Sequence, residues 1–126
     1  MVKPIEQLEA MRRLGENWDG YGAAAPQEKI IDLAREFVGL LDALLARCSA
    51  APAELRVSPT RVGGVLIDWE DGSIEHEVEL GPDASIGFLH HNKVTGAIAT
   101  RKFSASDRAV VDPGLLQELC QLLVAA

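Results

Sequence analysis

Residues 65–80 constrain the fold most, because apolar and acidic side chains alternate along this segment on both sides of a turn signal. A period of two predicts strands with one buried face and one exposed face. The dipeptide Asp71-Gly72 is a strong signal for a tight hairpin turn. We therefore expect two antiparallel strands around these two residues, with Asp68 opposite Glu75.

The two predicted strands, residues 62–70 and 73–80, divide their side chains between two distinct faces. One face is apolar and carries Val65, Ile67, Trp69, Ile74, His76, Val78 and Leu80. The other face carries Leu66 and five acidic residues, Asp68, Glu70, Glu75, Glu77 and Glu79. Because a histidine among apolar neighbours is more often a core residue than a catalytic base, we interpret His76 as structural.

Helices are predicted before and after the strands. Residues 4–15 have a three-residue apolar spacing behind a proline, and Pro26 opens a longer amphipathic helix that ends at about Arg47. The apolar stripe of the longer helix is wider than one sheet face requires, which predicts contact with a second element, either a helix or a second subunit. Asp112 and Pro113 are typical of the start of a C-terminal helix.

Further strands are predicted on both sides of the first hairpin. One begins near Leu55, and Pro59 limits how centrally it can lie in a sheet. A second hairpin is predicted with residues 91–93 as its loop, because this loop sets Phe88 opposite Gly96 and so compensates for a glycine in a strand.

The predicted order is two helices, about five antiparallel strands and a final helix, in a single domain over residues 1–126. A sheet with one apolar face can bury that face under the three amphipathic helices while its other face stays in water. We therefore expect an α+β two-layer sandwich.

The net charge of −7 argues against direct binding to nucleic acids or to anionic membranes. Residues 61–80 contain one basic and six acidic residues, so the first hairpin carries most of the excess negative charge. Like charges paired across strands destabilise a sheet. Three interpretations stay open: a solvated face that prevents edge pairing, a platform for a basic protein partner, and, less favoured by the spacing, a shared divalent cation.

A glycine-rich segment between the first two helices is typical of a turn and consists of Asn17, Trp18, Asp19, Gly20, Tyr21 and Gly22. We interpret it as structural, with Asp19 accepting hydrogen bonds from local backbone amides and the two aromatic rings filling the gap between helices. The alternative is a small hydrolase or nucleotide-processing enzyme that uses Asp19, Tyr21 and a remote histidine. Such an enzyme needs a pocket where these groups converge.

No metal, cofactor or catalytic site is expected. His90 and His91 are adjacent, so in a strand they point to opposite faces, and no third ligand accompanies them. Gly63-Gly64 is too short for a phosphate-binding loop and instead predicts a tight turn or a bulge at the start of a strand.

Two blocks of the sequence resemble a group of small bacterial proteins for which no activity is established. The first block is Asn17-Trp18-Asp19-Gly20-Tyr21-Gly22-Ala23 followed by Pro26, and the second is Pro59, then Gly63-Gly64-Val65, closing in Ile67-Asp68-Trp69-Glu70. The resemblance covers roughly the first 80 residues and transfers no catalytic residue. It implies an accessory role, such as that of an antitoxin, an immunity protein or a phage-defence component.

The chain contains no apolar run typical of a secretory signal or a membrane span, and we expect a cytoplasmic protein. Three functions of different classes follow. The first is a non-catalytic module that presents Asp68, Glu70, Glu75, Glu77 and Glu79 to a basic partner. The second is the enzyme that uses the Asp19 segment. The third is a structural subunit that forms a homodimer or larger oligomer through the broad stripe of the long helix.

Overall fold

The computed structural model describes residues 3–48, 54–83 and 85–103. They form two helices and then five strands: α1 (Pro4–Met11), α2 (Glu28–Cys48), β1 (Arg56–Pro59), β2 (Val65–Asp71), β3 (Ile74–Leu80), β4 (Ile86–Asn92) and β5 (Ile98–Phe103). The strands make one antiparallel sheet in the order β1-β2-β3-β4-β5, with Pro59 on an edge strand as predicted. The α+β class is confirmed. The helix predicted from Asp112 onward lies outside the described residues.

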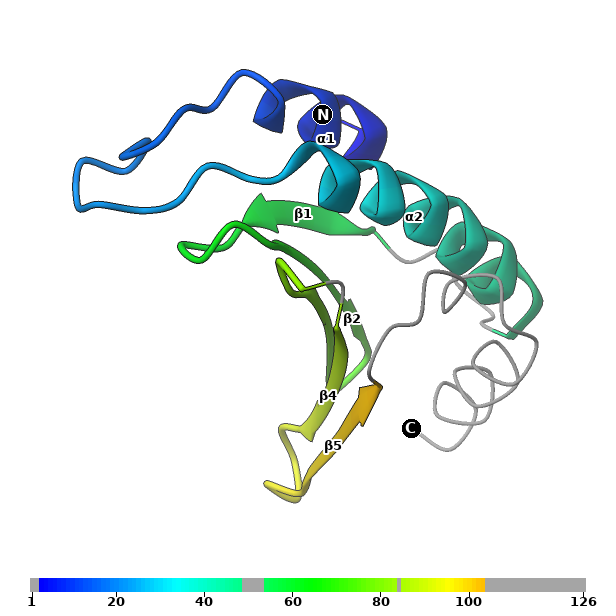
Figure 1. Cartoon of the computed structure of the whole chain (residues 1–126). Coiled ribbons are helices and arrows are strands. Elements are labelled where there is room, and N and C mark those ends of the chain that lie inside the picture. The colour runs from blue at the N-terminus through cyan, green and yellow to red at the C-terminus, as the bar shows by residue number, and fades with distance from the viewer. Residues whose placement is uncertain (1–2, 49–53, 84, 104–126) are drawn as a thin grey trace.

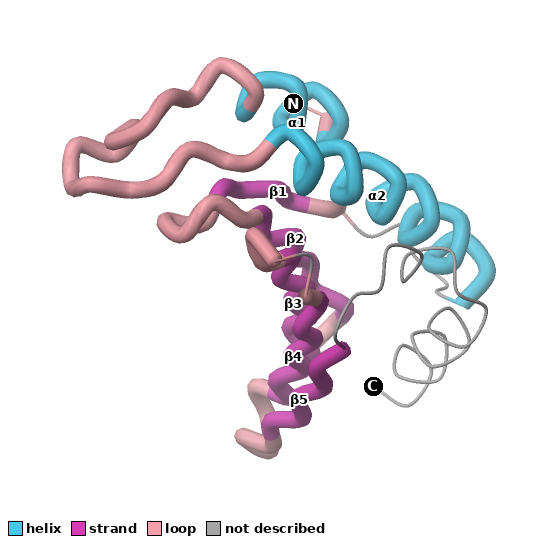
Figure 2. Tube along the Cα trace, viewed as in Figure 1, coloured by secondary structure: helices cyan, strands magenta, loops and turns pink. Residues whose placement is uncertain are grey.

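The two helices pack together on the sheet. Figure 1 shows α1 and α2 side by side next to β1, and Figure 2 shows the strands following one another from β1 beside the helices to β5 farthest from them. Helix α1 contacts both α2 and β1, while α2 also contacts β2. The second element predicted from the wide stripe of α2 is therefore α1, and Ile31 and Val38, which widen that stripe, are fully buried within the chain. None of the described helices is long and apolar enough to cross a membrane.

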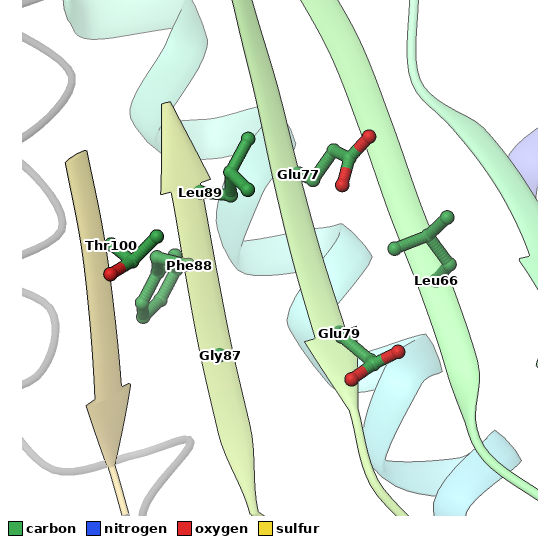
Figure 3. Close-up of a pocket in the computed structure, with 7 residues that line it drawn as sticks. All are labelled: Leu66, Glu77, Glu79, Gly87, Phe88, Leu89 and Thr100. Atoms are coloured by element: carbon green, nitrogen blue, oxygen red, sulfur yellow. The ribbon is translucent and has the colours of Figure 1, made fainter. Parts of the chain in front are cut away.

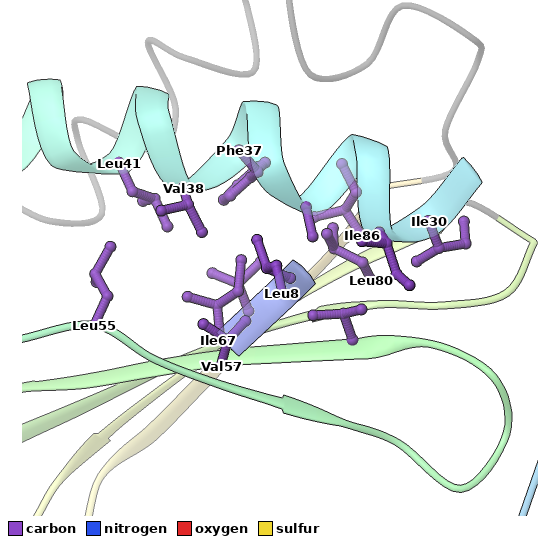
Figure 4. Packing of buried hydrophobic residues seen from close by; sticks show 14 of the residues in the cluster. Leu8, Ile30, Phe37, Val38, Leu41, Leu55, Val57, Ile67, Leu80 and Ile86 are labelled. Atoms are coloured by element: carbon purple, nitrogen blue, oxygen red, sulfur yellow. The ribbon is translucent and has the colours of Figure 1, made fainter. Parts of the chain in front are cut away.

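The core lies between the helices and one face of the sheet (Figure 4). Its largest side chains come from α2 and from alternate positions of the strands, and include Phe37, Leu41, Ile67, Trp69, Leu80 and Ile86. Phe37 of α2 lies against Phe88 of β4 with their ring centroids 6.2 Å apart. Because each such side chain contributes about 1.5–3 kcal/mol on burial, this face fixes which side of every strand points inward.

The helix ends differ from the predicted ends by a few residues. Helix α1 stops at Met11 because the amides that follow donate to the carbonyl three residues back instead of four. The Leu14 amide, for example, donates to the carbonyl of Met11 (3.1 Å). Arg12 then reaches across to Glu28 and Asp32 of α2, at 2.7 and 2.6 Å. These ion pairs connect the two helices at the point where α1 ends.

The pairing of the first hairpin differs from the prediction by two residues. The central turn residues are Gly72 and Ser73, so Asp71 pairs with Ile74 and Asp68 lies opposite Glu77, not Glu75. Gly72 has a φ of +61°, which suits a two-residue hairpin turn with glycine in its first central position. Because the shift is an even number, every side chain keeps its predicted face.

The second hairpin was predicted wrongly. Its loop spans residues 93–97 instead of 91–93, and His91 pairs with Ile98. The loop is closed by Asn92, whose side chain accepts the amides of Val94 and Thr95 at 2.9 and 3.2 Å. Because the shift is an odd number, Ile98 moves to the outer face, where 63% of it is exposed, and Phe88 faces Arg101 across the strands instead of Gly96.

Candidate functional site

The five acidic residues of the first hairpin share the outer face of the sheet, the face opposite the core. Their strand neighbours Ile67, Val78 and Leu80 are buried, whereas Glu70 and Glu79 are exposed and the other three acids are partly exposed. Pairing places Glu70 opposite Glu75, and Asp68 opposite Glu77. The acidic face predicted from the alternation is therefore present, although its cross-strand pairs are different.

Three of the five carboxylates have cationic or imidazole partners within the chain. Asp68 binds Arg56 of β1 at 2.6 Å. Lys93, in the loop after β4, lies 3.3 Å from a carboxylate oxygen of Glu70 and 3.8 Å from one of Glu75. His91 Nδ1 lies 3.4 Å from the other oxygen of Glu75. Part of the negative charge on this face is thus balanced locally.

Glu77 and Glu79 differ from the other three acids. Neither forms an ion pair or a side-chain hydrogen bond within the part of the chain that the structure describes. Both lie on β3, two residues apart on the same face, so their Cα atoms are separated by roughly 6.6 Å along the strand. Glu77 and Glu79 are thus the two carboxylates of this face that have no ion-pair partner among the described residues.

A hollow of about 320 Å³ lies beside the two free carboxylates (Figure 3). It is lined by Leu66, Glu77, Glu79, Gly87, Phe88, Leu89 and Thr100. The pairing explains its position, because Gly87 lies next to Glu79 and contributes no side chain to the outer face. A Cβ added to Gly87 would meet no heavy atom within 4 Å. The hollow therefore combines two apolar walls, Leu66 and Leu89, with two carboxylates.

A second hollow, of about 280 Å³, lies at the β1 edge of the same face and is lined by Glu54, Arg56 and Glu70. Arg56 already binds Asp68 there. This hollow therefore has its own cation and presents less free negative charge than the first one.

Residues 17–22, here called the motif loop, form a turn closed by their own polar groups. Asn17 adopts a φ of +61°, and its Oδ1 accepts the amide of Gly22 at 2.6 Å. The Asn17 amide donates to the carbonyl of Ala23 at 2.7 Å. Trp18 is partly buried and donates from Nε1 to the carbonyl of Ala24 at 2.9 Å.

Asp19 is the acceptor at the centre of the motif loop. Its Oδ1 accepts the amides of Tyr21 (2.8 Å) and Ala23 (3.1 Å), and its Oδ2 accepts Nε of Arg61 (2.8 Å). The bond from the Tyr21 amide is the main reason that the pKa of Asp19 lies below its usual value, with Ala23 and Arg61 acting in the same direction. The predicted role of Asp19 in binding local amides is confirmed. A carboxylate with a lowered pKa is poorly matched to general-base catalysis near neutral pH.

Tyr21 does not fill the gap between the helices, so that prediction is wrong. Tyr21 is 82% exposed, and it is its backbone that is bound: its amide donates to Asp19 and its carbonyl accepts from Arg61. No described histidine binds the Asp19 carboxylate, and neither of the two hollows includes a residue of the loop. The convergence that the enzyme hypothesis requires is not observed within the described residues.

A pair of buried histidines forms a polar cluster that the sequence did not reveal. His76 of β3 and His90 of β4 lie opposite each other, with their Nδ1 atoms 2.6 Å apart and only 1% and 9% of the residues exposed. Trp69 stacks on His76 with ring centroids 5.1 Å apart. His76 is a core residue, as predicted, and its pairing with His90 depends on the register of β3 against β4, which the sequence pattern did not predict.

This cluster holds two polar atoms that have no hydrogen-bond partner in the structure, Nε1 of Trp69 and Nε2 of His90. Burial lowers the pKa of His90, which keeps the ring neutral. No three His, Cys, Asp or Glu side chains of the described segments gather as a metal ion would require. Geometry and burial therefore point to a hydrogen-bonded core pair in which His90 is neutral.

Comparison with known proteins gives no match: no family model, curated protein or solved structure is significantly similar to this chain.

Proposed function

We propose that this chain is a non-catalytic, cytoplasmic protein-binding module whose acidic sheet face engages a basic partner protein. The supporting observation is that Glu77 and Glu79 have no ion-pair partner among the described residues, on an outer sheet face where Asp68, Glu70 and Glu75 are already paired. Uncompensated charge costs folding stability and gains nothing within the chain, whereas a cationic surface would be attracted to it. Such a protein would act in an accessory way, as antitoxins and immunity proteins do, and the resemblance of residues 17–23 to small bacterial proteins agrees with that role.

The carboxylates would contribute mainly to the rate and orientation of association. Charges at the rim of an interface steer the encounter and fix the register of the partner, while burial of apolar groups supplies most of the affinity. On this face the apolar groups are Leu66 and Leu89, which line the hollow, and Ile98, which is 63% exposed. No cofactor and no direct contact with nucleic acid are part of this proposal.

The test compares two charge-reversed variants. Glu77→Lys/Glu79→Lys changes the face, and Glu36→Lys/Asp42→Lys makes the same change in net charge at two exposed positions of α2. Proteins captured from a native lysate at low salt by the wild type are compared with those captured by each variant. A partner retained by the wild type and the α2 variant but lost from the face variant is then purified, and its association rate is measured.

We expect the face variant to lower that association rate by about tenfold at low ionic strength, and the difference to shrink as salt is added, because steering is screened. The α2 variant should remain within about threefold of the wild type. If both variants retain the same proteins at the same rates, the acidic face is not the binding surface and the proposal is wrong.

No observation favours the two alternative functions to the same degree. The Asp19 carboxylate is occupied by backbone amides and Arg61. The apolar stripe of α2, on which a structural oligomer would depend, buries Ile31 and Val38 within the chain itself.

A further inference from the structure

The outer face of the sheet offers one position where charge and shape agree. Pairing aligns Leu66, Glu79 and Gly87 in one row across β2, β3 and β4, and it aligns Glu77 with Leu89 in the next row. The hollow thus has a floor without a side chain at Gly87, a leucine on either side, and a carboxylate in each row. Its volume of about 320 Å³ lies at the lower end of the range of about 300–1,000 Å³ typical of ligand pockets.

This combination suits a side chain that is aliphatic along its stem and cationic at its tip. Lysine and arginine bury their methylene groups along apolar surface and keep the charged group in polar surroundings. Leu66 and Leu89 provide that apolar surface, and Glu77 and Glu79 provide acceptors that nothing else in the described chain uses.

Two further arguments narrow the choice of ligand. Glu77 and Glu79 are separated by two positions along β3. A guanidinium group has five N–H donors in a planar fork and can therefore bind both carboxylates, whereas an ammonium group is a compact charge. A hard divalent cation would need six or more oxygen ligands, and the walls of this hollow are leucines. The geometry therefore favours arginine over lysine and over a metal ion.

We propose that the hollow above Gly87 receives an arginine side chain of the partner, with its stem between Leu66 and Leu89 and its guanidinium group bound to Glu77 and Glu79. This inference rests on the proposed function, because it assigns the anchoring contact of the same face. It adds a requirement that charge alone does not impose: the space above Gly87 must stay empty.

The decisive variant is Gly87→Val, which fills the hollow and leaves every charge in place. Gly87 lies in β4 with ordinary strand geometry and with open space where a Cβ would lie, so a β-branched residue can be accommodated there. Glu77→Gln/Glu79→Gln removes the proposed acceptors. Glu70→Gln/Glu75→Gln is the matched control, because it removes the same charge from two carboxylates that Lys93 already contacts.

The probes are three short peptides in which serine alternates with arginine, lysine or the neutral isostere citrulline. Binding is followed by NMR titration of the isotope-labelled full-length protein. We expect the arginine peptide to shift the amides of Glu77, Gly87 and Leu89 and to bind more tightly than the lysine peptide, with no binding of the citrulline peptide. Gly87→Val and Glu77→Gln/Glu79→Gln should each weaken binding by about tenfold, and the matched control by less than about threefold.

The outcomes separate this inference from the proposed function. Equal binding of the arginine and lysine peptides, or no binding of the arginine peptide, overturns the inference. If Glu77→Lys/Glu79→Lys abolishes binding while folded Gly87→Val binds like the wild type, the acidic face binds a basic partner but the hollow is not its anchor. Should Gly87→Val not fold, Gly87→Ser, a smaller addition to the same floor, is expected to weaken arginine binding partially, and an unchanged affinity overturns the inference.

Discussion

The buried histidine pair makes a quantitative prediction about folding stability. With Nδ1 of His76 and Nδ1 of His90 2.6 Å apart, one ring must donate its proton and the other must accept it. Replacing His90 by leucine removes this partner from a buried nitrogen of His76, which should cost about 1–3 kcal/mol in the free energy of unfolding. Replacing both residues, as His76→Phe/His90→Leu, removes both polar groups and keeps a ring to stack on Trp69. The double variant should therefore recover part of the loss, with a coupling energy of about 1 kcal/mol or more.

The same pair predicts a pH dependence whose sign follows from burial. Burial lowers the pKa of His90 in the folded state, so below about pH 6.5 the unfolded chain takes up a proton at this position before the folded chain does. The contribution of His90 to stability is therefore complete above about pH 6.5 and is lost as the pH falls towards the folded-state pKa. The slope for one such group is at most about 1.4 kcal/mol per pH unit.

Urea unfolding followed by far-UV circular dichroism measures both effects, at a series of pH values between about 5.5 and 7.5. His91→Gln is the control, because His91 lies on the outer face beside Glu75 and is partly exposed. The wild type and His91→Gln should lose stability in parallel on acidification, and the double variant should lose much less. The single replacement His76→Phe completes the comparison. Identical pH dependence in the wild type and the double variant, or additive effects of His76→Phe and His90→Leu, would show that His90 is not a neutral, hydrogen-bonded partner of His76.

Two further predictions concern the motif loop and the glycines. Asp19→Ala should speed amide hydrogen exchange at Tyr21, because the alanine cannot accept this amide. In the wild type the protection should persist at neutral pH and be lost only below pH 3.8, the usual pKa of aspartate, because hydrogen bonds lower the pKa of Asp19. Gly64→Ala should destabilise the protein by more than about 1 kcal/mol in urea unfolding, because its Cβ would collide with the carbonyl oxygen of Leu80. Gly87→Ala should stabilise the protein by about 0.5–1 kcal/mol, because its Cβ would lie in open space. Equal effects of the two alanine substitutions would contradict this explanation.

The alternation of residues 65–80 predicted the faces of the first hairpin correctly even though the turn was misplaced. The dipeptide Asp71-Gly72 is typical of the two central residues of a turn, but here Gly72 occupies the first central position with a positive φ and Ser73 occupies the second. An error of two residues leaves the parity of every position unchanged, so the assignment of Glu77 and Glu79 to the outer face did not depend on the turn.

The second hairpin lacked a comparable signal. Its loop is set by Asn92, whose side chain accepts two backbone amides, and by Gly96, which adopts a φ of +75° and donates its amide to the carbonyl of Asn92 at 2.8 Å. These residues are typical of a turn, but a sequence alone does not say whether they flank a loop of three or five residues. The resulting odd shift reversed the predicted faces of β5. The pairing of His76 with His90 depends instead on the register of β3 against β4, which the sequence pattern did not predict.

The sequence predicts which face of the sheet carries the acidic residues, but it does not predict which of them have ion-pair partners. Alternation determines which side chains reach solvent, but the local balance of charge depends on which cations lie within about 4 Å, and these come from separate parts of the chain. Arg56 lies on β1, and Lys93 lies in the loop between β4 and β5, which is longer than predicted. Lys93 contacts Glu70 and Glu75 at one end of the acidic face, and Arg56 contacts Asp68, which lies opposite Glu77. Glu77 and Glu79 have no ion-pair partner among the described residues, and they line the glycine-floored hollow. If the acidic face served only to prevent edge pairing, the positions of Lys93 and Arg56 would be of no consequence, and any strand residue could replace Gly87. Binding by this face would instead depend on Glu77 and Glu79 and on the empty space above Gly87.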